Sequence, residues 1–212
     1  MRNIPFFTTE YGVAELILES VPNRQEAFIH IHSTDAPEKL LEECREFCIA
    51  CGAKRLYAAG DAFLEKYPFY MSVLQMNGDR PAIGETDAAL FPAQEKTANQ
   101  WRQIYNEKMT GVPKAAWISE MAMGKLVKEG NAYFVHREGQ LLGIGTASGT
   151  QIGAVISVVP GAGAEVVRAL CHALSGNAIS LEVASTNRAA FRLYEKLGFV
   201  TVGEKSRWYQ IL

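Results

Sequence analysis

The first part of the chain alternates short apolar segments with polar turns. Apolar residues at every second position, bounded by Gly, Pro, Asn and Asp, predict strands. These predicted strands cover residues 4–8, 12–20, 26–32, 54–59 and 69–76. Helical spacing predicts a helix from Pro37 to Cys51 that Gly52 ends, and a helical turn at 63–67.

A longer series of elements follows residues 77–87, a segment rich in Gly, Pro and acidic residues that we interpret as a linker. Helical periodicity predicts helices at 93–109, 115–129, 164–175 and 188–197. Alternating segments predict a hairpin and further strands at 132–137, 140–147, 151–159 and 179–184, with a closing pair at 199–202 and 206–212. This order is typical of an α/β or mixed α+β fold, with helices flanking a central mixed sheet.

The two series indicate two domains. Residues 1–80 form a smaller αβ module, and residues 88–212 form the larger domain. The order strand, helix, strand, helical turn, strand over residues 27–76 resembles that of residues 154–212. Residue identities do not repeat, so we interpret the first module as a decayed half-copy of the second.

Composition narrows the class of protein. Of 212 residues, 48% are hydrophobic and 21% are charged, which is ordinary for a globular protein with a real core. The net charge of −2, with no basic stripe, argues against nucleic acid as a partner. No apolar run approaches the roughly 18 residues that span a bilayer, so we expect no membrane partner and a cytoplasmic location. A monomer and a homodimer both remain open.

One segment joins a strand to a distinctive helix start. Residues 181–199 contain the pattern L-E-V-x-x-x-N-x-x-A-x-x-L-Y-E-K-L-G-F. Leu181 and Val183 share one strand face, which leaves Glu182 on the other. Asn187 stands where a helix N-cap belongs, and Gly198 permits a left-handed helix end.

This segment resembles the acceptor-side motif of the GNAT superfamily, whose members are acyl-CoA-dependent N-acyltransferases. The strand before Pro160, the turn Gly161-Ala162-Gly163 and the following helix resemble the acyl-CoA motif of that family. The two predicted helices and the hairpin that precede this strand also match the order of elements in the family. The resemblance covers residues 90–212 and implies a GNAT-like sheet.

The resemblance implies acetyl-CoA as co-substrate and no metal. A strand end would pair with the pantetheine arm, and amides at a helix N-terminus would bind the pyrophosphate. The residues implied are Ser157, Val158, Val159, Gly161, Ala162, Gly163, Ala164, Glu165, Asn187 and Ala190. The glycine turn is shorter than the family pattern, lacks its Arg or Gln, and carries Glu165 where a small residue is expected.

The resemblance also implies catalytic roles. Tyr194 would be the general acid toward the departing thiolate, and Glu182 would be the general base. Without the motif, a buried aromatic residue and a solvated strand carboxylate explain the same two positions. Tyr105, Met109 and Trp117 would contact the acceptor, although the core is the ordinary place for such side chains.

Two clusters outside the motif have metal-ligating side chains. His30 and His32 share one strand face, so they are either a metal or catalytic pair or simply polar residues at a partly exposed face. Cys44, Cys48 and Cys51 form one helical stripe, but without zinc-site spacing we interpret them, like Cys171, as buried reduced thiols.

Two functions follow from these observations. The first is an N-acetyltransferase that acts on an amine of a small molecule or peptide by direct attack. Cys171 lies within a helix and does not suggest a covalent thiol intermediate. The alternative is a degenerate, non-catalytic acyl-CoA-binding or interaction module, which the shortened glycine turn favours.

Overall fold

The computed structural model describes residues 1–113 and 115–212, which form two compact units. The first unit comprises Met1–Val73 together with Glu204–Leu212, and the second comprises Leu74–Gly203. Two strands, β5 (Phe69–Asp79) and β11 (Val200–Gln210), therefore have residues in both units. Each half of the chain contributes to both units.

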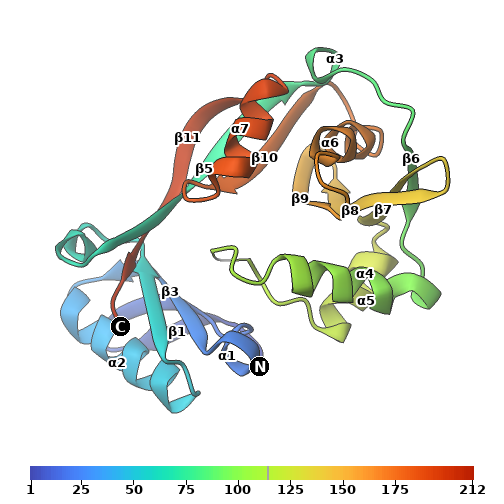
Figure 1. The fold of residues 1–212 in the computed structure, drawn as a ribbon. Coiled ribbons are helices and arrows are strands. Elements are labelled where there is room, and N and C mark those ends of the chain that lie inside the picture. Colours follow the sequence, from blue (N-terminus) through green and yellow to red (C-terminus); the bar gives the residue numbers. More distant parts are fainter. Residues whose placement is uncertain (114) are drawn as a thin grey trace. The chain divides into compact units, whose positions relative to one another are not determined.

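In the first unit, helix α2 (Pro37–Ala50) packs against the strands at one end of an 11-stranded sheet (Figure 1). The strand order at this end is β1-β2-β3-β4-β11-β5. Its other elements are β1 (Ile4–Thr9), β2 (Gly12–Ile17), α1 (Val21–Arg24), β3 (Glu26–Thr34), β4 (Arg55–Ala59) and η1 (Ala62–Lys66). Strands β3 and β4 are parallel, and the other recorded pairs in this unit are antiparallel.

In the second unit, the strand order is β11-β5-β10-β9-β8-β7-β6. The strands are β6 (Ala89–Pro92), β7 (Ala132–Arg137), β8 (Gln140–Ser148), β9 (Gln151–Ser157) and β10 (Ala178–Ala184). The helices are α3 (Arg80–Ile83), α4 (Glu95–Lys108), α5 (Glu120–Lys128), α6 (Gly163–Cys171) and α7 (Arg188–Lys196). This mixed sheet flanked by helices confirms the expected α+β fold with a GNAT-like sheet.

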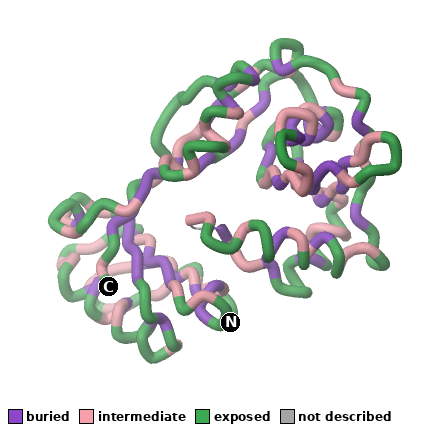
Figure 2. Tube along the Cα trace, viewed as in Figure 1, coloured by how far each residue is buried: buried purple, intermediate pink, exposed green. Residues whose placement is uncertain are grey.

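The second unit has one core on each face of its sheet. Helices α6 and α7 pack on one face over Val155 and Leu181, whereas α4 and α5 cover the other face over Ala154 and Ile156. Buried positions run along the strands, while the turns are mostly exposed (Figure 2). Alternation along β9 therefore assigns neighbouring residues to different cores.

The predicted linker at 77–87 is wrong over its first and middle parts. Strand β5 continues through Asn77 and Gly78, because Gly78 packs on the Phe199 ring, which lies 2.9 Å from where a Cβ would be. Helix α3 follows, with its Arg80 amide bonded to the Asn177 carbonyl and Ile83 2% exposed. Strand β6, which the sequence pattern did not suggest, pairs with β7.

Two other element predictions need correction. The expected closing pair of strands is the single strand β11, since Gly203 adopts no turn and the strand runs beside the equally long β5. The helix expected from residue 115 begins at Glu120, where Ser119 caps it. Before that helix, the buried Asn106 side chain bonds both backbone groups of Ile118 at 2.9 Å and holds the chain outside helical geometry.

The cysteine stripe of α2 lies in the core of the first unit. Cys44 and Cys48 are fully buried, and no disulfide joins the cysteines of the described residues. Burial raises the pKa of both thiols to about 12, so they stay protonated at neutral pH. The interpretation of these two residues as buried reduced thiols is confirmed.

Within the described ranges, no helix has the length and apolar character needed to cross a membrane.

We expect Gly78→Ala to destabilise the protein by about 1–3 kcal/mol, because the added methyl group forces the Phe199 ring out of its packed position. Chemical denaturation measures the change. Gly203→Ala is the matched control, since a Cβ on this strand glycine would have no atom within 4 Å among the described residues. Equal stability of the two variants would contradict the packing argument.

Candidate functional site

In the second unit, a β-bulge in the β8–β9 pair lies where β9 parts from its parallel neighbour β10. Thr146 of β8 pairs with Ala154 of β9, but Ala147 pairs with Ile152, so Gly153 is an extra residue. A bulge of this kind bends its strand and interrupts the ladder. In the described part of the chain, β9 and β10 are paired only at Gln151 with Ser180 and at Ile152 with Leu181. The two strands therefore part immediately at the bulge.

The parting leaves one edge of β9 open inside the sheet. The Val158 amide donates to the Leu142 carbonyl of β8 at 2.8 Å, and the Val159 amide reaches the same oxygen at 3.3 Å. Because backbone groups alternate between the two sides of a strand, those of Val155 and Ser157 face the gap. Three residues at this strand end are predicted to contact the cofactor. The backbone of Ser157 faces the gap, whereas the amides of Val158 and Val159 are already bonded to Leu142.

The turn after β9 presents free amides at a helix N-terminus. Gly161 has a φ of 84°, a left-handed conformation that favours glycine, and Ala162 is the N-cap of α6 without a side-chain cap bond. The first helical amide with an acceptor is that of Val166, which bonds to the Ala162 carbonyl. No acceptor within the described residues takes the amides of Gly163, Ala164 and Glu165. With the helix dipole, these amides make an anion-binding geometry.

A basic side chain reaches this turn from another element. Arg137, at the end of β7, donates through Nη1 to Oε2 of Glu165 in the first turn of α6. Both side chains are partly exposed, at 40% and 25%. Sequence reasoning noted the missing cation in the turn but overlooked Arg137, which lies 28 residues away in the chain. Its position at the end of the β7–β8 hairpin was the available signal.

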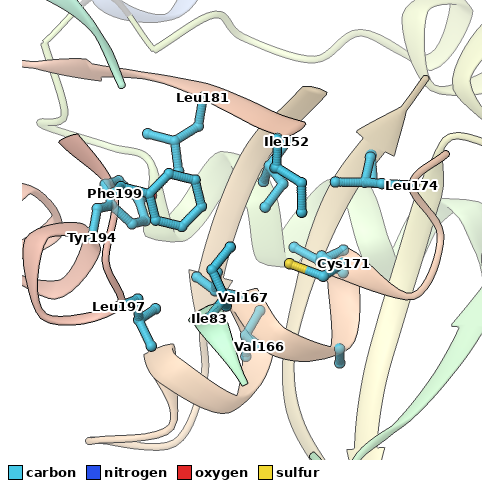
Figure 3. Packing of buried hydrophobic residues seen from close by; sticks show 14 of the residues in the cluster. Ile83, Ile152, Val166, Val167, Cys171, Leu174, Leu181, Tyr194, Leu197 and Phe199 are labelled. Carbon is cyan, nitrogen blue, oxygen red and sulfur yellow. The ribbon is translucent and has the colours of Figure 1, made fainter. Parts of the chain in front are cut away.

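Tyr194 lies in the core between α7 and the sheet. Its side chain is 7% exposed and packs edge-on against Phe199, with a distance of 5.9 Å between ring centroids (Figure 3). Burial raises the pKa of its hydroxyl to about 12, and no partner within the described residues bonds that hydroxyl. At neutral pH the hydroxyl therefore keeps its proton and is able to donate it.

Two further motif residues lie at the start of α7. The Asn187 side chain caps the helix by accepting a hydrogen bond from the Ala190 amide at 3.3 Å, which confirms the predicted cap. Ala190 is partly buried against the same core as Tyr194. Gly163 of α6 lies close to this helix, because a Cβ on it would approach Leu193 to 2.9 Å. The N-terminal turn of α6 and the helix α7 are thus in contact.

Glu182 lies on the opposite face of the sheet from Tyr194. Its neighbours Leu181 and Val183 belong to the core that contains Tyr194, and alternation turns the exposed Glu182 side chain the other way. The sheet thus separates the two predicted catalytic side chains, and the structure does not bring them together.

The predicted acceptor residues belong to the face of α4 and α5. Tyr105 is 7% exposed and stacks on Trp101, and Met109 is partly buried in the same core. Trp117 was expected in a helix, but it lies in the segment before α5. A cavity of about 530 Å³ between α4 and α5 is lined by Arg102, Met123 and neighbours, and by none of the predicted acceptor residues.

The first unit repeats the strand order without the gap. Its parallel strands β3 and β4 are paired at five successive positions, from Glu26 with Arg55 to His30 with Ala59. The helix after β3 begins at Pro37 and not after a glycine turn. An open strand edge of the kind seen beside β9 is therefore absent between β3 and β4, both of which are fully described.

Comparison with solved structures shows that the chain has the GNAT fold. A functionally unknown conserved protein from Staphylococcus epidermidis superposes with a TM-score of 0.61 at 12% identity, over 96% of this chain and 91% of its own. A GCN5-related N-acetyltransferase from Kribbella flavida gives 0.60 at 13% identity, over 96% and 58%. A tandem GNAT protein from the clavulanic acid biosynthesis pathway gives 0.52 at 14% identity, over 94% and 78%. No protein-family model and no curated protein sequence matches the chain.

We expect Tyr194→Phe to change how stability depends on alkaline pH. The unfolded tyrosine loses its proton near pH 10, whereas the folded one holds it until about pH 12, so its contribution is lost as pH rises between these values. The difference in unfolding free energy between the protein and the variant should shift by roughly 2–3 kcal/mol across this window. Denaturant titrations at a series of pH values measure it, and parallel curves would contradict the burial of the hydroxyl.

Proposed function

We propose that the chain is an N-acetyltransferase that transfers an acetyl group from acetyl-CoA to an amine by direct attack. The observation that carries the proposal is the gap that opens beside β9 at the Gly153 bulge and ends at the free amides of α6. The fold is that of acetyltransferases, and residues 181–199 carry the acceptor-side pattern. Acetyl-CoA would supply the activated thioester.

A pantetheine arm, which is extended and carries amides, would lie in this gap. The backbone groups of Val155 and Ser157 would pair with the arm as with an added strand. The amides of Gly163, Ala164 and Glu165 would hold the pyrophosphate. Asn187 and Ala190, at the start of α7, would contact the arm on its other side; Gly161 and Ala162 shape the turn.

Arg137 would replace the cation that the glycine turn lacks. An unpaired Glu165 carboxylate would repel a pyrophosphate at the same helix N-terminus. The ion pair with Arg137 removes that repulsion and leaves further guanidinium donors for a phosphate oxygen. The shortened turn would therefore still be able to bind the pyrophosphate of acyl-CoA.

Proton donation to the thiolate and proton removal from the amine would take place on different faces of the sheet. Tyr194 would donate its proton to the departing thiolate from the face of α6 and α7, because the raised pKa keeps the hydroxyl protonated. The amine would approach from the face of α4 and α5, where Glu182 would accept its proton, directly or through water. An acceptor with a low amine pKa would need less help from this exposed carboxylate.

We expect Tyr194→Phe to lower kcat by about 10²–10⁴-fold, because the variant lacks the hydroxyl that donates the proton. CoA affinity should stay unchanged, because the gap beside β9 is not altered. Thiol release from acetyl-CoA over a panel of amines measures kcat, and calorimetry measures CoA binding. Tyr133→Phe is the matched control, as this tyrosine packs on the same core outside the motif. Unchanged turnover in Tyr194→Phe would remove Tyr194 from the mechanism.

We expect Arg137→Ala to weaken CoA binding by about 10-fold or more, because it leaves Glu165 unpaired and removes charged donors worth about 1.5–3 kcal/mol. Adding Glu165→Gln should restore part of the affinity. Full restoration would assign Arg137 to neutralising Glu165 alone, and an unaltered affinity in Arg137→Ala would contradict the role of this ion pair.

The alternative function is a non-catalytic acyl-CoA-binding module. It is favoured by the exposed position of Glu182, which leaves the proposed base without a fixed partner among the described residues. The two assays decide between the functions: CoA binding without turnover on any amine supports the module, and absence of CoA binding contradicts both.

A further inference from the structure

Three metal-ligating side chains meet on one face of the sheet in the first unit. His30 of β3 pairs directly across the ladder with Glu15 of β2. His32 follows two residues later on the same strand, and the rings of the two histidines are 5.1 Å apart between centroids. One ligand atom from each of the three side chains lies within 4.8 Å of the others. Histidine and carboxylate therefore converge from two strands.

A second bulge aims His32 into this group. Ala14 pairs with Ile31 and Val13 pairs with Ser33, so His32 is an extra residue in β3. Bulges re-aim the side chain that they carry. Ile29 and Ile31, on either side of His30, point into the core on the α2 face, which leaves the histidines on the other face. The position of His32 is thus set by a departure from regular pairing.

An aromatic side chain lies near each of the two histidine rings. The His30 ring lies 6.1 Å from the Trp208 ring, and the His32 ring lies 6.3 Å from the Phe6 ring, both between centroids. Glu15 and His30 are partly buried, whereas His32 is exposed and gives an ion a route from solvent. Strands also hold ligands more precisely than loops do.

The donor set is that of a transition metal. Two imidazole nitrogens and one carboxylate oxygen are typical ligands of Zn²⁺, with bonds of about 2.0–2.2 Å. Tetrahedral geometry would bring the ligand atoms to about 3.4 Å from one another, which requires only a side-chain adjustment from the observed group. Ca²⁺ and Mg²⁺ prefer all-oxygen sites and fit this group less well.

We propose that Glu15, His30 and His32 bind one Zn²⁺ ion and leave its fourth coordination position open to water or a small ligand. This site belongs to the first unit and does not depend on the acetyltransferase proposal, which concerns the second. It also departs from the sequence-based expectation of no metal, because Glu15 joins the histidines through strand pairing and not through proximity in the sequence.

The test is calorimetric titration of tag-free, chelator-treated full-length protein with Zn²⁺ in neutral buffer. We expect one ion per chain with a Kd in the micromolar range or tighter. Glu15→Gln and His32→Ala should each weaken binding at least 10-fold, with unchanged circular dichroism. His172→Ala is the matched control, since this histidine belongs to the second unit, beside Glu85, and its loss should leave binding intact.

Titration with Co²⁺ tests the identity of the ligands independently. A site of nitrogen and oxygen ligands gives visible d–d absorption without the thiolate charge-transfer band that cysteine ligands produce. Absence of binding, binding that survives His32→Ala, or a thiolate band would each overturn the proposal. Loss of CoA binding or of acetyl transfer leaves this result unaffected, so the two proposals fail separately.

Discussion

The extra residue at Gly153 is the constraint on which the functional unit depends. A continuous sheet satisfies every interior peptide group by pairing it with a neighbouring strand, and buried unpaired groups are costly. By shifting the register of β9 against β8, the bulge withdraws β9 from β10 while its other edge stays bonded. The sheet thereby keeps an unsaturated edge in its middle, and the proposed function places the acyl-CoA arm there.

The surrounding elements make that edge usable. Helix α6 starts close to where the gap ends, and its first residue, Gly163, packs against Leu193 in the second half of α7. The Arg137–Glu165 pair adjusts the charge at the turn. In the first unit, the parallel strands β3 and β4 are paired along the whole of β4 and offer no such edge. The candidate metal ligands of that unit lie on the face of the sheet instead.

Local signals made much of this structure predictable. The Asn187 cap, the hairpin of β7 and β8 and the helix α7 follow from short-range periodicity and turn chemistry, and the motif located Tyr194 in a strand–helix unit. Features that depend on register were not predictable. Neither bulge has a sequence signature, because each exists only relative to a partner strand. The pairing of Glu15 with His30 and of Arg137 with Glu165 likewise joins distant residues, and Asn77–Gly78, a turn signal in isolation, became part of a strand when Phe199 packed on it.

The division of β5 and β11 between the units has a consequence for how the chain is made. Strand β4 pairs on one side with β3 and on the other with residues of β11, at Ala58 with Tyr209 and Tyr57 with Gln210. The ribosome therefore releases the first unit with one edge of β4 bare, and that edge stays bare until the entire second unit has been synthesised. An unpaired strand edge invites pairing with other chains. The native sheet of the first unit is therefore completed only after β11 has been synthesised.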